Sequence, residues 1–82
     1  MVKVIFDKKF ESFISKIKDN LLKEKVIKQI DKIIAFPDIG KPMRFNRKGT
    51  REVYVKPFRL SYIHHVEQSI IEFLEIYHKD EQ

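Results

Sequence analysis

Seven basic residues cluster in the middle third of the 82-residue chain, where they could form a surface that binds phosphate. Residues 37–60 hold these seven with only two acidic residues, whereas residues 61–82 hold one basic and five acidic residues. A polyanion fits such a segment, because each neutralised phosphate releases counterions. A small basic domain that binds no polyanion has the same composition, so both interpretations stay open. The seven are Lys41, Arg44, Arg47, Lys48, Arg51, Lys56 and Arg59.

Arg59 is the first candidate for phosphate binding. It stands between Phe58 and Leu60, two apolar residues that should anchor the backbone around it. An arginine held by packed neighbours presents a rigid fork of donors that suits a phosphate group. The alternative is a structural arginine that pairs with a carboxylate from a neighbouring strand: Glu52, Glu72 or Glu75.

The other basic residues are better suited to holding a nucleic-acid backbone than to chemistry. Arg51 and Lys56 belong to one predicted strand, but their odd separation places them on opposite faces of it. Arg51 then shares the face of Val53 and Val55, or lies at the frayed start of the strand. The remaining four lie in or beside loops, where they could contact phosphates without reading bases: Lys41, Arg44, Arg47 and Lys48.

The histidines predict no metal site. His64 and His65 are adjacent, so in a strand they point to opposite faces and cannot chelate one ion. The chain has no cysteine and no HxH or HExxH pattern, so we expect neither zinc nor another cofactor. His78 follows the apolar segment "EFLEIY" and could act as a general acid or base. An exposed histidine at the end of a strand is the alternative.

The first half of the chain predicts a strand and a helical hairpin. Residues 2–6 are short and β-branched, as in a strand, and Asp7 can cap a helix over residues 8–18. Asp19 and Asn20 supply a break and a new cap. A second helix over residues 21–36 ends before Pro37, which disfavours a helical residue in front of it. Apolar residues recur at i, i+3, i+4 and i+7 in the first helix: Phe10, Phe13, Ile14 and Ile17.

The second half predicts an antiparallel meander. Residues 51–56, 58–65 and 70–78 have the composition and the spacing of turns that are typical of strands, and "MRFN" at 43–46 could begin another. We therefore expect an α+β fold in which an N-terminal strand and a helical hairpin pack on a three- to four-stranded antiparallel sheet. The second sheet face would stay free for a ligand.

Length and composition indicate a single domain over residues 1–82. No apolar run approaches the roughly 18 residues that a membrane helix needs, so no membrane association is expected. The N-terminal apolar run is too short for a signal peptide, and the lack of cysteine fits a cytoplasmic protein. There is also no phosphate loop, nucleophile elbow or dinucleotide-binding motif.

In their order along the chain, these segments resemble the RelE/ParE superfamily of prokaryotic toxins. The resemblance covers nearly the whole chain, and it depends most on "PFRLSY" and "IYHKD", with "IIAFPDIGKPM" at the end of the second helix. The first motif is similar to the aromatic–Arg–hydrophobic–x–Tyr strand of the family, and the second is similar to its basic C-terminal segment. Within the superfamily the chain looks more like the RelE branch than the ParE branch, and so resembles a RelE-type toxin of a type II toxin–antitoxin system.

The resemblance implies a ribosome-dependent, metal-independent mRNA endoribonuclease that inhibits translation. In such toxins the 2′-OH of the RNA attacks the neighbouring phosphate, and the protein supplies cations and titratable groups. By position, Arg59 would stabilise the scissile phosphate, Lys79 would add charge, and His78 would transfer protons. Lys41, Arg44, Arg47, Lys48, Arg51 and Lys56 would grip the RNA backbone. The implied partners are the ribosome, mRNA and a cognate RelB-like antitoxin.

Two departures from the RelE pattern bear on activity. Relatives often have a basic residue at the position of Glu52 and a tyrosine near the position of Gln82. The first departure replaces a basic residue by an acidic one in the basic strand, and the second removes a stacking or base group. Two alternatives therefore stand beside the nuclease: a ParE-like inhibitor of DNA gyrase, and a module that binds RNA or antitoxin with little or no catalysis.

Overall fold

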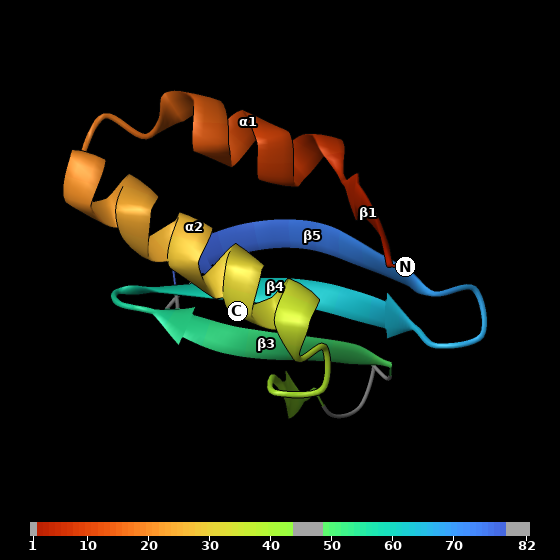
Figure 1. Ribbon diagram of the computed structural model, residues 1–82. Helices are drawn as coiled ribbons and strands as arrows, with labels where there is room; N and C mark the ends of the chain where they lie inside the picture. The colour runs from red at the N-terminus through yellow and green to blue at the C-terminus, as the bar shows by residue number, and fades with distance from the viewer. Residues whose placement is uncertain (1, 44–48, 79–82) are drawn as a thin grey trace.

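The computed structural model describes residues 2–43 and 49–78, and within them two helices cover one face of a five-stranded sheet (Figure 1). The spatial order of the strands is β1-β5-β4-β3-β2, with β1 parallel to β5 and the other pairs antiparallel. In chain order the elements are β1 (Lys3–Phe6), α1 (Lys8–Lys16), α2 (Asn20–Ala35), β2 (Lys41–Pro42), β3 (Thr50–Val55), β4 (Phe58–His65) and β5 (Ile70–His78).

The expected α+β fold is confirmed, but the sheet has more strands than predicted and is not purely antiparallel. The N-terminal strand does not pack on the sheet; it joins it, pairing with β5 from Lys3–Ile70 to Phe6–Phe73. Pairing satisfies the backbone of β1 and covers what would otherwise be an exposed edge of β5. Lys41–Pro42 adds a short strand at the opposite edge, just before the predicted 43–46 segment, most of which lies outside the described residues.

Both helices begin at the predicted caps. The Asp7 carboxylate accepts a hydrogen bond from the Lys9 amide, and the Asp19 carboxylate accepts one from the Leu21 amide. Each cap satisfies an amide that has no partner within the helix. The helices end at Lys16 and Ala35, slightly earlier than predicted, and neither is long and apolar enough to span a bilayer.

The core lies between the helices and the sheet, with α1 over β5 and α2 over β3 (Figure 1). A bulge in β5 shifts its register against β4, so that Ser61 faces Glu75 while Tyr62 faces Phe73. The extra residue, Leu74, allows Phe73 and Ile76 both to point toward the helices although their separation is odd. Fully or nearly buried apolar side chains form this core: Phe10, Val26, Ile33, Val55, Leu60, Tyr62, Ile71, Phe73 and Ile76.

Candidate functional site

The sheet face that the helices leave uncovered holds Arg59. In β4, Leu60 and Tyr62 are buried in the core beneath the helices, and the ring of Phe58 packs against Phe13 of α1. Side chains alternate along a strand, so Arg59, between Phe58 and Leu60, points to the opposite side. We call this side the helix-free face. Its members near Arg59 come from four strands: Lys41, Glu52, Tyr54, Arg59 and Tyr77.

The Arg59 guanidinium is held by two neighbours from β3. Its Nη1 atom lies 3.4 Å from Oε1 of Glu52, and its Nη2 atom donates a hydrogen bond of 3.1 Å to the Tyr54 hydroxyl. The guanidinium carbon also lies 5.1 Å from the centre of the Tyr54 ring, within the range of a cation–π interaction. Together these contacts fix the plane of the guanidinium, which a bidentate phosphate contact requires.

Glu52 is the carboxylate at the centre of this cluster. Its Oε2 atom accepts a hydrogen bond of 3.0 Å from the Tyr77 hydroxyl, while Oε1 faces Arg59. The side chains of Glu52 and Arg59 are 15% and 20% exposed, so water screens this ion pair less than it would on an open surface. Nε of Arg59 is buried and has no hydrogen-bond partner among the described residues. The site thus combines a cation, a carboxylate and two phenols.

Lys41 borders the cluster at the edge of the sheet. It lies directly opposite Glu52 in the β2–β3 pair, and residues opposite each other in a sheet share a face. Its side chain is exposed, and within residues 2–43 and 49–78 no carboxylate forms an ion pair with it. Lys41 therefore adds a positive charge beside Glu52 on the helix-free face.

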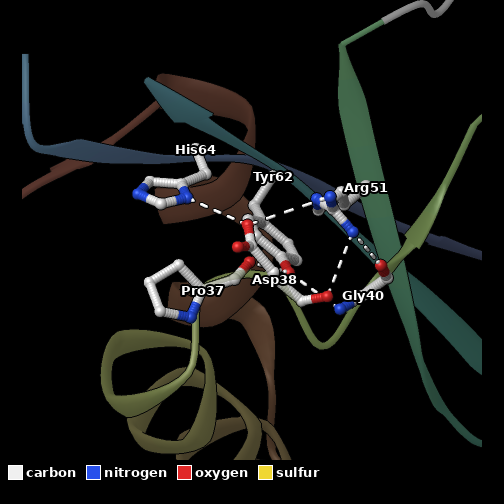
Figure 2. Close-up of polar contacts among 6 residues, drawn as sticks. All are labelled: Pro37, Asp38, Gly40, Arg51, Tyr62 and His64. Atoms are coloured by element: carbon white, nitrogen blue, oxygen red, sulfur yellow. Dashed lines mark hydrogen bonds and ion pairs between the residues drawn. The ribbon is translucent and has the colours of Figure 1, made fainter. Parts of the chain in front are cut away.

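Arg51 lies on the other face, where it joins the α2–β2 loop to the sheet (Figure 2). Its Nη1 atom donates hydrogen bonds to the carbonyl oxygens of Asp38, at 3.0 Å, and Gly40, at 2.7 Å. Its Nη2 atom lies 3.8 Å from the Asp38 carboxylate, which also lies 3.1 Å from Nδ1 of His64. The donors of Arg51 are thus directed at the loop.

Tyr62 is the second anchor of this loop (Figure 2). Its hydroxyl donates a hydrogen bond of 2.6 Å to the Pro37 carbonyl and accepts one of 2.9 Å from the Gly40 amide. Gly40 is required at this position, because a Cβ there would lie 2.7 Å from the Tyr62 hydroxyl oxygen. Burial raises the pKa of Tyr62 above its ordinary value of 10.0, while the Gly40 hydrogen bond and the Arg51 charge act in the opposite direction.

Comparison with known proteins identifies the family. Residues 4–82 match the family described as the ParE toxin of type II toxin–antitoxin systems, parDE. The chain belongs to this family. No curated protein matches it in sequence. The family match over residues 4–82 confirms the RelE/ParE superfamily resemblance and identifies the chain as the toxin component of a toxin–antitoxin system.

Solved structures of RelE- and ParE-type proteins share the fold of this toxin. It aligns with the intact RelBE toxin–antitoxin complex from E. coli at 14% identity and a TM-score of 0.79, covering 95% of this chain and 96% of that one. A YoeB/ParE toxin from Agrobacterium tumefaciens gives 14% identity and 0.84, covering 94% and 98%. The RelBE2 complex from Mycobacterium tuberculosis gives 23% identity and 0.78, covering 95% and 98%. At these identities the likeness establishes the fold alone.

The structure of this toxin separates two of its predicted catalytic residues. His78 lies directly opposite Phe58 in the β4–β5 pair, and the two rings make an edge contact with centroids 5.7 Å apart. Since Phe58 faces the helices, His78 does so too and lies on the face opposite to Arg59. Lys79, the third residue, lies outside the described residues. The carboxylate alternative for Arg59 is realised with Glu52, one of the three partners that the sequence offered.

The predicted RNA-gripping residues of the toxin lie in different places. Lys41 is beside the cluster on the helix-free face, whereas Arg51 binds the α2–β2 loop on the helix side. Lys56 is exposed in the turn between β3 and β4. Three lie outside the described residues: Arg44, Arg47 and Lys48.

Two side-chain contacts within the site were not predicted from the sequence. Tyr54 touches Arg59 with both its hydroxyl and its ring, and Tyr77 positions Glu52. Their place beside Arg59 follows from strand register, which sequence patterns indicate only weakly.

His65 lies apart from the cluster, with its Nε2 atom 3.1 Å from Glu72. Among the residues that the structure describes, no three His, Asp or Glu side chains are grouped in a way that could hold a metal ion.

Proposed function

We propose that this toxin is a ribosome-dependent mRNA endoribonuclease and that the Arg59 cluster is its active site. The observation that carries the proposal is a partly buried arginine on the helix-free face, oriented by a carboxylate and a phenol. Cleavage of RNA through its own 2′-OH needs a cation at the phosphate and groups that transfer protons. A ribosomal target would place the toxin in the cytoplasm.

Each step of the reaction can be assigned to a residue of the cluster. The Glu52 carboxylate takes the proton of the 2′-OH while the 2′-oxygen forms a bond to phosphorus. Arg59 stabilises the additional negative charge on the phosphate oxygens. As the bond from phosphorus to the 5′-oxygen breaks, the hydroxyl of Tyr54 donates a proton to that oxygen. The products are a 2′,3′-cyclic phosphate and a free 5′-OH.

Two roles proposed from the family resemblance remain separate predictions. His78 would transfer protons and Lys79 would add charge, but His78 points to the helix side of the sheet. Glu52 and Tyr54 are the titratable groups in contact with Arg59, so they take the proton-transfer roles in our mechanism. Lys41, next to Glu52, would hold a phosphate adjacent to the scissile one.

The test is cleavage of mRNA on purified ribosomes, with cut sites mapped by primer extension and end groups analysed chemically. Arg59→Ala should lower the cleavage rate by about 10²- to 10³-fold, the usual effect of removing a group that stabilises transition-state charge. Arg59→Lys keeps the charge but loses the fork, so it should retain partial activity. Lys18→Ala, an exposed lysine between the two helices, is the control and should cleave normally. Undiminished cleavage by the folded Arg59→Ala protein would refute the assignment.

A cognate antitoxin is the second part of the proposal. Two of the solved relatives above are toxin–antitoxin complexes. The described surface of this toxin also has an apolar groove of about 370 Å³ between α1 and α2, which Phe6 and Ile27 border with large exposed side chains. An amphipathic antitoxin segment with acidic residues would suit both this groove and the net charge of +5. Coexpression with the neighbouring small reading frame, followed by co-purification, tests this partner.

Inhibition of DNA gyrase is the competing function, and the family match favours it because the family is described by its ParE toxin. The Arg59–Glu52 ion pair also fits this function, because an arginine neutralised by a carboxylate attracts phosphate less strongly. A supercoiling assay with purified gyrase separates the two functions. Inhibition without mRNA cleavage would establish the gyrase function, and inactivity in both assays would favour a binding module without catalysis.

A further inference from the structure

Arg59 has a tyrosine on either side of it, and the two tyrosines differ in what they can reach. Tyr54 of β3 and Tyr77 of β5 both lie directly opposite Arg59, so all three side chains share the helix-free face. Tyr54 is 56% exposed, whereas Tyr77 is 9% exposed. The hydroxyl of Tyr54 bonds to Arg59, but that of Tyr77 donates to Oε2 of Glu52. Tyr77 is thus placed to act on the carboxylate rather than on a ligand.

The Tyr77 bond is the firmer of these two contacts of the Glu52 carboxylate. Its 3.0 Å between oxygens lies within the range of about 2.5–3.0 Å that is usual for O–H···O bonds. The 3.4 Å between Nη1 of Arg59 and Oε1 of Glu52 exceeds the roughly 3.2 Å that is usual for N–H···O bonds. Glu52 starts in β3 and its side chain reaches across β4 to Tyr77 on β5. The buried phenol therefore fixes the carboxylate more tightly than the guanidinium does.

Without the Tyr77 bond, Glu52 could close onto Arg59. A carboxylate and a guanidinium often form two parallel hydrogen bonds. Here Glu52 offers Arg59 one oxygen, because Tyr77 binds the other. Arg59 has a donor for a second bond, since its Nε has no partner among the described residues. A two-point pair would neutralise the guanidinium and occupy the carboxylate, so neither group could serve an RNA phosphate.

We propose that Tyr77 is a positioning residue that prevents this two-point pair. It keeps the Arg59 guanidinium available to phosphate and Oε1 of Glu52 available to the 2′-OH. This inference rests on the proposed nuclease function for the reaction that Tyr77 serves. Tyr77 acts through Glu52 and does not touch the RNA, so its effect must depend on the charge of the Glu52 carboxylate.

A double-mutant cycle tests this dependence. The four proteins are the wild type, Tyr77→Phe, Glu52→Gln and the double variant. Glu52→Gln keeps the shape of the side chain but removes the charge that drives pairing with Arg59. Each protein is assayed for single-turnover cleavage of mRNA on purified ribosomes, and its affinity for a 2′-O-methyl single-stranded RNA is measured by fluorescence anisotropy. Tyr62→Phe is the matched control, because it also removes one buried phenolic oxygen but on the helix side of the sheet.

The expected result is a loss that appears only when Glu52 is charged. Tyr77→Phe alone should cleave about 10- to 100-fold more slowly, the usual effect of a displaced catalytic group. It should also bind the RNA about two- to fivefold more weakly, the contribution of one partly exposed charge contact. In the Glu52→Gln background the same substitution should leave the RNA affinity and the remaining cleavage rate unchanged. Tyr62→Phe should lower the melting temperature but cleave at the wild-type rate while folded, which separates a loss of stability from a loss of positioning.

Equal losses from Tyr77→Phe in the two backgrounds would overturn the proposal, because a hydroxyl that only supports the fold does not depend on the charge of Glu52. Undiminished cleavage and RNA affinity in Tyr77→Phe alone would overturn it as well. If the wild-type toxin cleaves but the cycle shows no coupling, the positioning role fails and the nuclease proposal stands. If the wild-type toxin does not cleave, the nuclease proposal fails, and coupling in RNA affinity still identifies Tyr77 as the residue that keeps Arg59 open to phosphate.

Discussion

Replacing Tyr62 by phenylalanine should destabilise the toxin strongly, although it removes a single oxygen atom. The ring of Tyr62 is fully buried, and its hydroxyl makes two hydrogen bonds to the α2–β2 loop (Figure 2). The phenylalanine ring fits the same space, so no large cavity forms. The change therefore isolates the hydroxyl, whose loss leaves the Gly40 amide and the Pro37 carbonyl without their partner.

The size of the effect follows from the burial of these two groups. Leaving a buried donor unpaired costs about 1–3 kcal/mol, and this applies to the amide of Gly40, which is buried. The Pro37 residue is only half-buried, so its carbonyl loses about 1 kcal/mol, the net value of a typical hydrogen bond. The expected loss is about 2–4 kcal/mol. A domain of this length has roughly 4–12 kcal/mol in total, so the loss is a large share.

Urea unfolding followed by circular dichroism measures the loss, with Tyr54→Phe as the matched control. The Tyr54 side chain is exposed, and its hydroxyl accepts one bond from Arg59, so its removal should cost less than about 0.5 kcal/mol. The melting temperature of Tyr62→Phe should fall by roughly 10–25 °C. If both substitutions cost the same, within about 0.5 kcal/mol, the Tyr62 hydroxyl does not anchor the loop and the reasoning is wrong.

Three further predictions concern the same network and the Arg59 cluster. Burial raises the pKa of Tyr62, so the folded state holds the hydroxyl proton more tightly than the unfolded state does. The contribution of this hydroxyl to stability is therefore complete below pH 10.0 and declines as the pH rises further. In urea titrations, the stability difference between wild type and Tyr62→Phe should shrink between pH 8 and about pH 11. Gly40→Ala should cost about 1–3 kcal/mol in the same assay, because the new Cβ meets the Tyr62 ring; normal stability would contradict this. Glu52→Gln should bind a single-stranded RNA with 2′-O-methyl groups, which cannot be cleaved, more tightly than the wild type does, but should cleave mRNA more slowly. Its loss of cleavage rate should exceed that of His78→Ala; the reverse order would return the proton-transfer role to His78.

Local signals in the sequence predict most of the elements of this toxin. Asp7 and Asp19 cap the helices as expected, and the strands at 58–65 and 70–78 have the predicted bounds. Caps, turns and periodicity act over a few residues, so one sequence is enough to identify them. The pairing of β1 with β5 joins residues far apart in the chain, and no local pattern indicates which strand edge is available.

The site was predicted less completely, for the same physical reason. Charge density directs attention to residues 37–60, but the sequence does not indicate which of these cations bind the protein itself. Arg51 is directed at carbonyl oxygens 11 and 13 residues earlier in the chain, a pairing that depends on how the α2–β2 loop folds back. His78 and Arg59 are separated because β4 and β5 align Phe58, not Arg59, with His78. Strand register therefore decides which residues can act together.

The Arg59–Glu52 pair reconciles the charge of the site with the chemistry proposed for it. Glu52, the residue that departs from the RelE pattern, partly neutralises Arg59 and so weakens ground-state attraction for phosphate. It also fixes the guanidinium, and in the proposed reaction it would place a carboxylate beside the scissile phosphate, where the 2′-OH loses its proton. Weak binding at the reacting phosphate then requires affinity from elsewhere. In our mechanism Lys41, which lies opposite Glu52 on the same sheet face, supplies this affinity without stabilising the ground state at the scissile bond.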